Sequence, residues 1–451
     1  MVMQEFKDQQ VCVIGLGYVG LTLAVVMADV GFQVLGVDIR DEVCNALASG
    51  KAHFYEPGLE QRLQRVIRSG HFKFAKRIPF DVGCAVYIIT VGTPLSADGK
   101  ARMDMVQNVA REVALHLREG DLVIMRSTMK LGTTRSVVMP LLEAAGKQFD
   151  LAFCPERTLE GKALTELRQL PQIVGGSNAA TVRASQLFSY LTPTVIRVSD
   201  LETAEMIKLI DNTHRDVAFA FANEVARACD AVGVSAAEVI QSGKLGYSRT
   251  NVPMPGLVGG PCLQKDPHIF AERLCELGFE PEITLAARRI NERQPSEIVS
   301  YLKQIATTLS GFPDKPVISF LGIAFKGQPA TDDLRGTMAK PVMDEIRAKF
   351  SYATLRGFDA ELASEDIKSF GLDPVASLEE AFKGASLVLI LNNHPLFLAM
   401  PIEILSQQMM EVGVIYDFWN CFNRDELHLP EMVEYVALGS HGKTKFATGI
   451  K

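Results

Sequence analysis

The chain has 451 residues, more than a single hydrophobic core normally supports, so we expect two or three domains. Its 47% hydrophobic and 22% charged residues are typical of a globular protein, and its net charge of −7 argues against broad binding of nucleic acid or anionic membranes. We expect neither a signal peptide nor a membrane span, because the N-terminus is polar and no apolar run approaches about eighteen residues. Eight cysteines without a CxxC pair predict reduced thiols in the cytoplasm, without a disulfide framework or a metal site.

The first predicted element is a short apolar strand, 11–14, which runs directly into Gly15-Leu16-Gly17-Tyr18-Val19-Gly20. An apolar helical stretch, 21–30, follows, and a second predicted strand, 33–37, ends at Asp38. A GxGxxG motif alone is weak evidence. The motif here nevertheless lies between a strand and a helix, and a second strand that ends in an acid follows. This order predicts a βαβ unit that binds a dinucleotide.

Each glycine of this motif has its own expected role. Gly15 makes the tight turn, Gly17 lets pyrophosphate approach the backbone amides, and Gly20 allows the helix to pack closely. Asp38 would accept hydrogen bonds from the ribose hydroxyls and repel a 2′-phosphate, which favours NAD over NADP. Arg40 nearby weakens this distinction, because an arginine there can hold a 2′-phosphate.

Two further apolar runs end in threonines that could face a ligand. The runs 85–91 and 122–125 lead to Thr93 and Thr128, and ligands of open α/β sheets gather at the carboxyl ends of strands. Each threonine alone is equally typical of a turn or a cap.

The loop 153–161 follows another predicted strand and carries two acids, Glu156 and Glu160. A carboxylate at this place can act as a general base beside a reacting centre. A solvated loop acid is the ordinary alternative.

The segment 199–232 is the longest predicted helix, with Ser199 and Glu202 as a capping box. It would be roughly 50 Å long, enough to join two domains and to supply a dimer surface. Lys208 and Asn212, four residues apart, point the same way and could hold an oxyanion or a water, although a solvent-facing polar stripe is the alternative. Residues at three- and four-residue steps predict a buried stripe made of Ile207, Ile210, His214, Val217 and Phe221.

A glycine-rich loop, 253–268, carries Cys262, the cysteine best placed to be a nucleophile. We expect Asp266 to cap a helix that has Pro267 in its first position. Cys262 would then lie near a helix N-terminus, where a thiolate is favoured and Lys265 would add positive charge. A buried cysteine that only fills space is the alternative. Tight turns or close approach to a ligand are expected at Gly256, Gly259 and Gly260.

After a helical region that ends near Leu309, the chain again alternates strands and helices, without a second GxGxxG motif. Lys326 and Arg335 follow the first of these strands and are placed to bind a phosphate-bearing ligand. We therefore predict an α/β fold, with two Rossmann-like doubly wound domains joined by a long central helix and a helical dimerisation domain. The predicted domains are a dinucleotide-binding domain at 1–198, a central domain with the cysteine loop at 199–310, and a C-terminal Rossmann-like domain at 311–451.

Seven motifs along roughly 10–425 resemble the UDP-glucose/GDP-mannose dehydrogenase family, in the family's own order. They are GLGYVGL at 15–21, YEPGL at 55–59, Ser-Thr at 127–128, PE…EG at 155–161, K…N at 208 and 212, GGxCxxKD at 259–266, and FK…TDDLR at 325–335.

The resemblance implies an NAD-dependent nucleotide-sugar 6-dehydrogenase, a homodimer that makes a UDP-uronic acid for surface polysaccharide. It implies a four-electron oxidation in which a cysteine captures the intermediate aldehyde as a thiohemiacetal, which is oxidised to a thioester and hydrolysed. The implied catalytic residues are Cys262, Lys208, Asn212, Asp266, Glu156 and Thr128. The implied NAD-binding residues are Gly15, Gly17, Tyr18, Val19, Gly20, Asp38, Thr93, Thr128 and Lys265. The implied substrate-binding residues are Glu156, Glu160, Lys208, Asn212, Arg249, Asn251, Gly259, Lys326 and Arg335.

Some positions depart from the commonest family pattern and bear on the sugar. Pro261 precedes the cysteine where serine or histidine is more usual, and Trp419 stands where an arginine is common. The stretch Arg249-Thr250-Asn251 is similar to that of the UDP-N-acetylhexosamine enzymes, which favours such a substrate slightly over UDP-glucose.

Two other functions remain open on the sequence alone. A single-step NAD-dependent hydroxyacid dehydrogenase could share the lysine and asparagine, but it would need neither Cys262 nor a second βα domain. A catalytically inactive protein that senses NAD or a nucleotide sugar is disfavoured by the intact set of Lys208, Asn212, Cys262 and Asp266.

Overall fold

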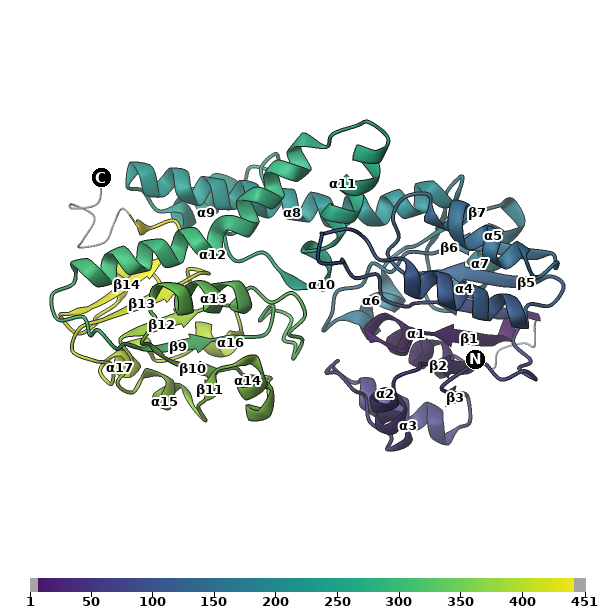
Figure 1. Cartoon of the computed structure of the whole chain (residues 1–451), viewed down its shortest axis with the longest axis horizontal. Helices are drawn as coiled ribbons and strands as arrows, with labels where there is room; N and C mark the ends of the chain where they lie inside the picture. The colour runs from purple at the N-terminus through teal and green to yellow at the C-terminus, as the bar shows by residue number, and fades with distance from the viewer. Residues whose placement is uncertain (1–6, 442–451) are drawn as a thin grey trace. The chain divides into compact units, whose positions relative to one another are not determined.

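The computed structural model describes residues 7–441, which form two compact units (Figure 1). Unit 1 contains the residues up to 212 together with 268–280, and unit 2 contains 213–267 and the residues from 281 onward. One helix, α8 (Leu201–Val232), links the two units. No helix among residues 7–441 is long and apolar enough to cross a membrane.

Unit 1 is built on an eight-stranded sheet of order β3-β2-β1-β4-β5-β6-β7-β8, parallel except where β7 runs antiparallel to β6. The strand order reverses between β1 and β4, and ligands of doubly wound sheets bind at the carboxyl ends of strands at such a reversal. The strands are β1 (Gln10–Ile14), β2 (Gln33–Val37), β3 (Phe72–Ala75), β4 (Val86–Ile89), β5 (Asp121–Met125), β6 (Phe149–Phe153), β7 (Gln172–Gly176) and β8 (Val195–Arg197).

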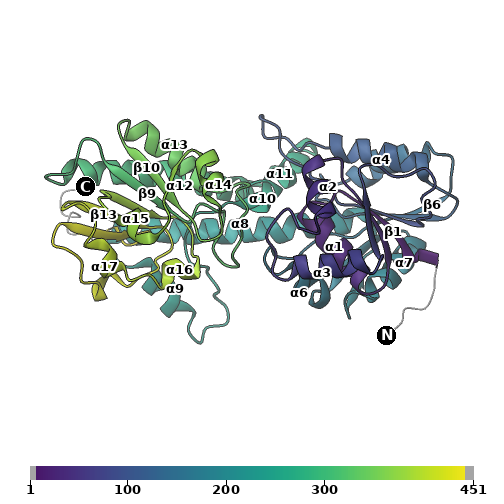
Figure 2. The same cartoon turned by 90° about the horizontal axis from the view of Figure 1, so that it is seen from below.

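Helices cover both faces of this sheet, because alternate residues of each strand point to opposite sides. In β1, Val11 and Val13 pack in one apolar core, and Cys12 and Ile14 pack in another. Figure 2 shows α7 and α4 on opposite sides of the sheet. The helices are α1 (Tyr18–Asp29), α2 (Asp41–Ala48), α3 (Leu59–Arg68), α4 (Asp104–His116), α5 (Met139–Glu143), α6 (Ala163–Gln169), α7 (Asn178–Ser189) and most of α11 (Asp266–Glu276).

Unit 2 contains a second, fully parallel sheet of six strands, of order β11-β10-β9-β12-β13-β14. Its core is also divided in two, with α12 and α13 packed on one face and α15 and α17 on the other (Figure 1). The strands are β9 (Val317–Leu321), β10 (Thr354–Phe358), β11 (Asp373–Pro374), β12 (Leu387–Ile390), β13 (Gly413–Asp417) and β14 (Val433–Ala437). The helices are α9 (Ala236–Lys244), α10 (Gly260–Leu263), α12 (Glu282–Thr308), α13 (Ala339–Lys349), α14 (Ser364–Phe370), α15 (Leu378–Phe382), α16 (Pro395–Leu398) and α17 (Ile402–Ser406).

The predicted fold class is confirmed, since two doubly wound sheets are linked by one long helix. The predicted capping box of that helix is wrong. Asp200 accepts the hydrogen bond from the Thr203 amide at 2.7 Å, and Glu202 instead pairs with Arg135. Asp200 is the better cap because it lies directly before the first helical residue.

The predicted buried stripe of α8 is also wrong. Ile210 and Phe221 are 48% and 56% exposed, and His214 is exposed as well. The buried positions carry Leu209 and small residues such as Ala226 together with polar side chains, namely Glu205, Asn212, Thr213, Asp216 and Asn223. A pattern of apolar residues therefore could not identify the buried face.

Candidate active site

The glycine-rich turn after β1 has the shape that a dinucleotide site needs. Gly15 has a φ of +92°, in the region that glycine adopts most readily, and Thr90 donates to its carbonyl at 2.6 Å. A Cβ on Gly20 would overlap the Gly15 carbonyl oxygen, so only glycine lets α1 start this close to the turn. A Cβ on Gly17 would meet no atom within 4 Å, which leaves open space where a pyrophosphate could approach.

Asp38 follows β2 and is tied to the same turn. Its carboxylate accepts from the Leu16 amide at 2.9 Å and from the Arg40 guanidinium at 3.0 Å. Burial alone would raise the pKa of Asp38, but the bonds from Arg40 and Leu16 outweigh it, and the pKa is lowered. Asp38 is thus ionised and Arg40 is held against it, an arrangement that suits ribose hydroxyls better than a 2′-phosphate.

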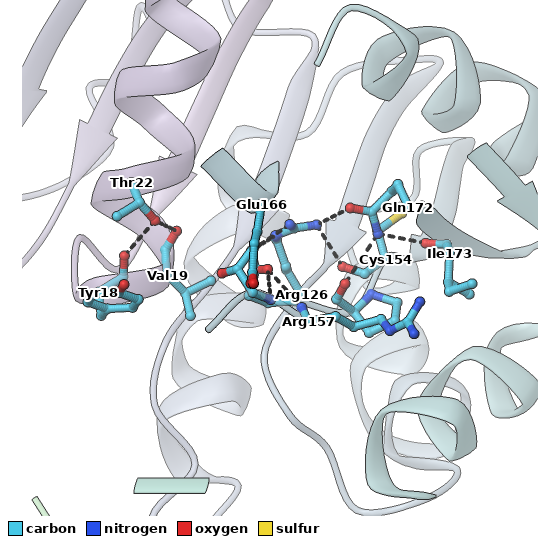
Figure 3. A network of polar contacts seen from close by, with 12 residues as sticks. Tyr18, Val19, Thr22, Arg126, Cys154, Arg157, Glu166, Gln172 and Ile173 are labelled. Carbon is cyan, nitrogen blue, oxygen red and sulfur yellow. Dashed lines mark hydrogen bonds and ion pairs between the residues drawn. The ribbon is translucent and has the colours of Figure 1, made fainter. Parts of the chain in front are cut away.

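Glu156 lies at the start of the loop after β6, buried against Arg126. Figure 3 shows the Arg126 side chain between Cys154 and Gln172 and the beginning of this loop at Arg157. The guanidinium contacts the Glu156 carboxylate at 2.5 Å, and it also donates to the Cys154 carbonyl and to Gln172. The amides of Arg157 and Thr158 donate to the other carboxylate oxygen at 2.7 and 2.8 Å. Both oxygens therefore hold the loop in place.

The charge of Glu156 follows from these contacts. Burial would raise the pKa of Glu156, but Arg126, the Thr158 amide and Lys208 together lower it. Glu156 is consequently ionised at neutral pH. Arg126 and Gln172 were not identified from the sequence, and the only available signal was a charged residue directly after a fully buried strand.

The far end of the same loop is fixed by Tyr18 and Glu56. The Tyr18 hydroxyl donates to Glu56, and the Gly161 amide contacts both side chains, at 2.8 and 2.7 Å. Burial and Glu56 raise the pKa of Tyr18, which keeps the hydroxyl protonated. Glu160 also raises this pKa, which places it in the same neighbourhood. Glu56, within the YEPGL motif, thus gains a structural role that the sequence did not suggest.

Unit 1 also places Lys208 and Asn212 of α8 near this loop. Lys208 lowers the pKa of Glu156, and Asn212 is buried on the same helical face. The neighbouring Asp211 pairs with Arg157 at 2.8 Å, so loop and helix are joined directly.

The two predicted threonines follow β4 and β5, as expected. Thr93 is buried and Thr128 is partly buried. The Ser127 hydroxyl donates to the Val91 carbonyl at 2.7 Å, which ties the ends of β4 and β5 together, next to the reversal of strand order between β1 and β4.

Cys262 belongs to unit 2, where it is exposed in the short helix α10. The Gly260 amide donates to the Gly336 carbonyl at 2.7 Å, and a Cβ on Gly260 would lie 2.5 Å from the Phe325 ring. A Cβ on Gly259 would lie equally close to the Gly336 oxygen. The glycines therefore let the loop pack directly against the C-terminal sheet domain.

The other predicted site residues of unit 2 range from fully buried to exposed. Asp266 begins α11 rather than capping it, is fully buried, and pairs with Lys265 at 2.8 Å. Lys326 lies over the Phe325 ring at 5.0 Å, which brings it beside the cysteine loop. Arg335 forms a two-pronged pair with Asp333, and Arg249 stacks on Tyr247 in an exposed stretch that includes Asn251.

Three family models match consecutive parts of the chain. They describe the NAD binding domain of the UDP-glucose/GDP-mannose dehydrogenase family at 9–192, its central domain at 202–293 and its UDP binding domain at 319–424. The chain belongs to this family. The predicted NAD cofactor and nucleotide-sugar dehydrogenase activity are thereby confirmed.

Similar proteins of known identity agree with this placement. The UDP-N-acetyl-D-mannosamine dehydrogenase of Pyrococcus horikoshii is 34% identical over 412 residues, which cover 90% of this chain and 94% of that protein. A solved UDP-D-ManNAc dehydrogenase from the same organism matches with a TM-score of 0.85 at 32% identity, covering 96% of this chain and 100% of that one. A UDP-glucose dehydrogenase from Pyrobaculum islandicum matches with a TM-score of 0.82 at 26% identity, covering 95% and 97%.

Proposed function

We propose that this dehydrogenase oxidises the C6 alcohol of a UDP-N-acetylhexosamine, UDP-N-acetyl-D-mannosamine in the first place, to the uronate. The observation that carries the four-electron reaction is the exposed thiol of Cys262 in a glycine loop that is packed on the C-terminal sheet domain. The choice of sugar is supported by the Pyrococcus relative and by the Arg249-Thr250-Asn251 stretch.

NAD would be held at the turn that contains Gly15, Gly17 and Gly20 and by Asp38, and two NAD molecules bound there in succession would supply the hydride acceptor, one for each oxidation step. Once C6 has become an aldehyde, the Cys262 thiolate adds to it and forms a thiohemiacetal. Loss of the second hydride from C6 gives a thioester. Water then attacks the thioester carbonyl, the carbon–sulfur bond breaks, and the carboxylate leaves with the thiolate regenerated.

The remaining roles belong to donors and a base. We assign Lys208 and Asn212 to the negative charge that develops on the C6 oxygen. Asp266, acting through water, is a better base than Glu156, because both oxygens of Glu156 are bonded and its pKa is lowered. For the nucleotide end of the substrate we assign Lys326 and Arg335.

We further propose a homodimer formed through α8. Ile210 and Phe221 expose about half of their side chains on this helix, and large apolar side chains of this kind are typical of subunit interfaces. The cytoplasm, where thiols stay reduced, is the proposed location.

The test is the number of NADH molecules formed per sugar consumed. Wild type and Cys262→Ser would be compared on UDP-N-acetyl-D-mannosamine, UDP-N-acetyl-D-glucosamine, UDP-glucose, UDP-galactose and GDP-mannose. We expect two NADH per UDP-N-acetyl-D-mannosamine for wild type, and a stalled reaction for the variant. One NADH per sugar, unaffected by the substitution, would favour the single-step dehydrogenase. NAD binding without turnover of any sugar would favour the inactive sensor.

A further inference from the structure

The polar residues buried between α8 and α12 in unit 2 form one connected network. Asp216 and Asn223 on α8 face Arg288 and Asn291 on α12, and all four are almost completely buried. None of them belongs to a motif identified in the sequence. Asp216 and Asn223 occupy buried positions of α8, which is also a reason why the predicted apolar stripe was wrong.

The network is continuous from one helix to the other. Arg288 donates to the Asp216 carboxylate at 2.6 Å, and Asn291 donates to the same oxygen at 2.9 Å. Asn223 donates its amide hydrogen to the Asn291 side-chain oxygen at 3.0 Å. The Asp216 carboxylate, together with Glu292 on the far side of the guanidinium, therefore fixes Arg288, and Asn291 links Asp216 to Asn223.

Both ends of the network reach the backbone of the cysteine loop. The same terminal nitrogen of Arg288 that contacts Asp216 donates to the Leu263 carbonyl at 3.0 Å, one residue after Cys262. At the other end, the Asn223 side-chain oxygen accepts from the Gly256 amide at 3.0 Å, six residues before Cys262. The two contacts thus bracket the stretch that carries the sulfur.

Stability alone does not account for this arrangement. Buried ion pairs are often no better for stability than well-packed apolar residues of similar volume, because desolvation offsets the attraction. Apolar side chains, however, could not hold a carbonyl and an amide of a loop without regular structure before Gly260. Buried side chains that form hydrogen bonds to the carbonyl and the amide of a loop can fix a single conformation of that loop.

We propose that Arg288 and Asn223 are positioning residues for the cysteine step, with Arg288 oriented by Asp216 and Asn223 by Asn291. They hold the Cys262 loop in the one conformation that presents the sulfur to the aldehyde. The inference rests on the proposed thiohemiacetal reaction. Because the first hydride transfer does not use the sulfur, the network should matter for the second NADH and not for the first.

The experiment is single-turnover NADH formation with UDP-N-acetyl-D-mannosamine, or with the sugar nucleotide that the substrate panel identifies. For Asn223→Ala and Arg288→Met we expect a first phase within about twofold of wild type and a second phase slowed at least tenfold, on the order of 1.4 kcal/mol of transition-state stabilisation. Arg288→Lys keeps a cation with three N–H donors, enough for both the Asp216 carboxylate and the Leu263 carbonyl, and should restore the second phase to within about threefold.

A matched control is Gln294→Met, which changes another buried polar residue of α12 that makes no hydrogen bond to the cysteine loop. It should leave both phases unchanged. Equal slowing of both phases in the Asn223 variant, or no slowing of the second in either variant, would overturn the inference. Cys262→Ala, measured in parallel, separates the two proposals: this variant has no nucleophile at position 262, so if it forms the second NADH normally, the cysteine mechanism itself fails.

Discussion

Gly17 and Gly20 belong to the same turn but have opposite surroundings, which leads to opposite predictions. Gly20→Ala would force a Cβ into the Gly15 carbonyl, so we expect a loss of stability of about 3 kcal/mol or more. Gly17 has a φ of −68° that any residue adopts, so Gly17→Ala should unfold at the wild-type urea concentration. Its NAD dissociation constant should nevertheless rise about tenfold, because the new methyl occupies the pyrophosphate approach.

Urea denaturation and calorimetric titration with NAD check both variants. An unaltered NAD affinity in Gly17→Ala would remove the assignment of this open space to the cofactor. Normal stability of Gly20→Ala would contradict the close packing of α1 on the turn.

Glu156 illustrates what the sequence can reveal about a single residue. Its position after a strand identified it as a candidate acid or base. No sequence pattern indicated that Arg126, thirty residues away, pairs with Glu156 and lowers its pKa. This pairing depends on which strands are neighbours in the sheet, here β5 and β6. Because of it, Glu156, a candidate base, shapes the loop after β6.

At the scale of elements, Asp230 of α8 and His441 after β14 form a partly buried pair. The His441 amide donates to Asp230 at 2.6 Å, the imidazole lies 3.1 Å from the same carboxyl, and the Tyr416 hydroxyl contacts the other ring nitrogen. Burial raises the pKa of Asp230 to about 7 and lowers the pKa of His441 to about 3. Near pH 5 both groups are therefore neutral. Their contributions to the stability of the fold depend on pH in opposite directions.

The signs follow from proton binding. Between about pH 4 and 7 the folded protein keeps a proton on Asp230 that the unfolded chain has lost, so this group makes stability fall as pH rises. Between about pH 3 and 6.5 the unfolded chain protonates His441 and the folded protein does not, so this group makes stability rise with pH. The two contributions largely cancel between about pH 4 and 6.5.

Replacing either residue of the pair should reveal the pH dependence of stability that the other contributes. Urea midpoints of Asp230→Asn should rise with pH from about 4 to 6.5 more steeply than those of wild type, and midpoints of His441→Gln should fall from about pH 4 to 7. Both variants keeping the wild-type pH dependence would show that neither pKa is shifted by burial.

The helix α8 also shows where pattern recognition ends. Its length was predicted almost to the residue, because glycine and proline are absent between 201 and 232. The face of α8 that is buried was not predicted, since this face carries hydrogen-bonded polar groups and large apolar side chains remain exposed. Periodicity assumes that buried means apolar, and that assumption fails where a helix fixes a loop through hydrogen bonds.

At the scale of the whole molecule, the order of motifs was enough to predict two doubly wound domains linked by a helix. Parallel strands buried on both faces read as continuous apolar runs, and these are easily located. The domains' family followed from motif order in the same way. The contacts that Arg288 and Asn223 make with the cysteine loop come from residues outside every motif and required the structure.

The exposed apolar residues of α8 give a prediction for the assembly. If they form the dimer interface, Phe221→Arg should place a charge at the contact and yield a monomer at micromolar concentration. Light scattering of the full chain measures this directly, with Tyr352→Arg, a change at an exposed residue away from α8, as the control. A variant dimer as stable as wild type would exclude this face of α8.

The covalent role of sulfur is tested most directly by the mass of the Cys262→Ser chain after incubation with NAD and UDP-N-acetyl-D-mannosamine. An oxygen nucleophile at position 262 can still be acylated, but the resulting ester hydrolyses more slowly than a thioester. We predict a protein that carries one covalently attached UDP-uronyl group, located by peptide mapping at position 262. An unmodified mass, with two NADH formed per sugar at the wild-type rate, would contradict the account.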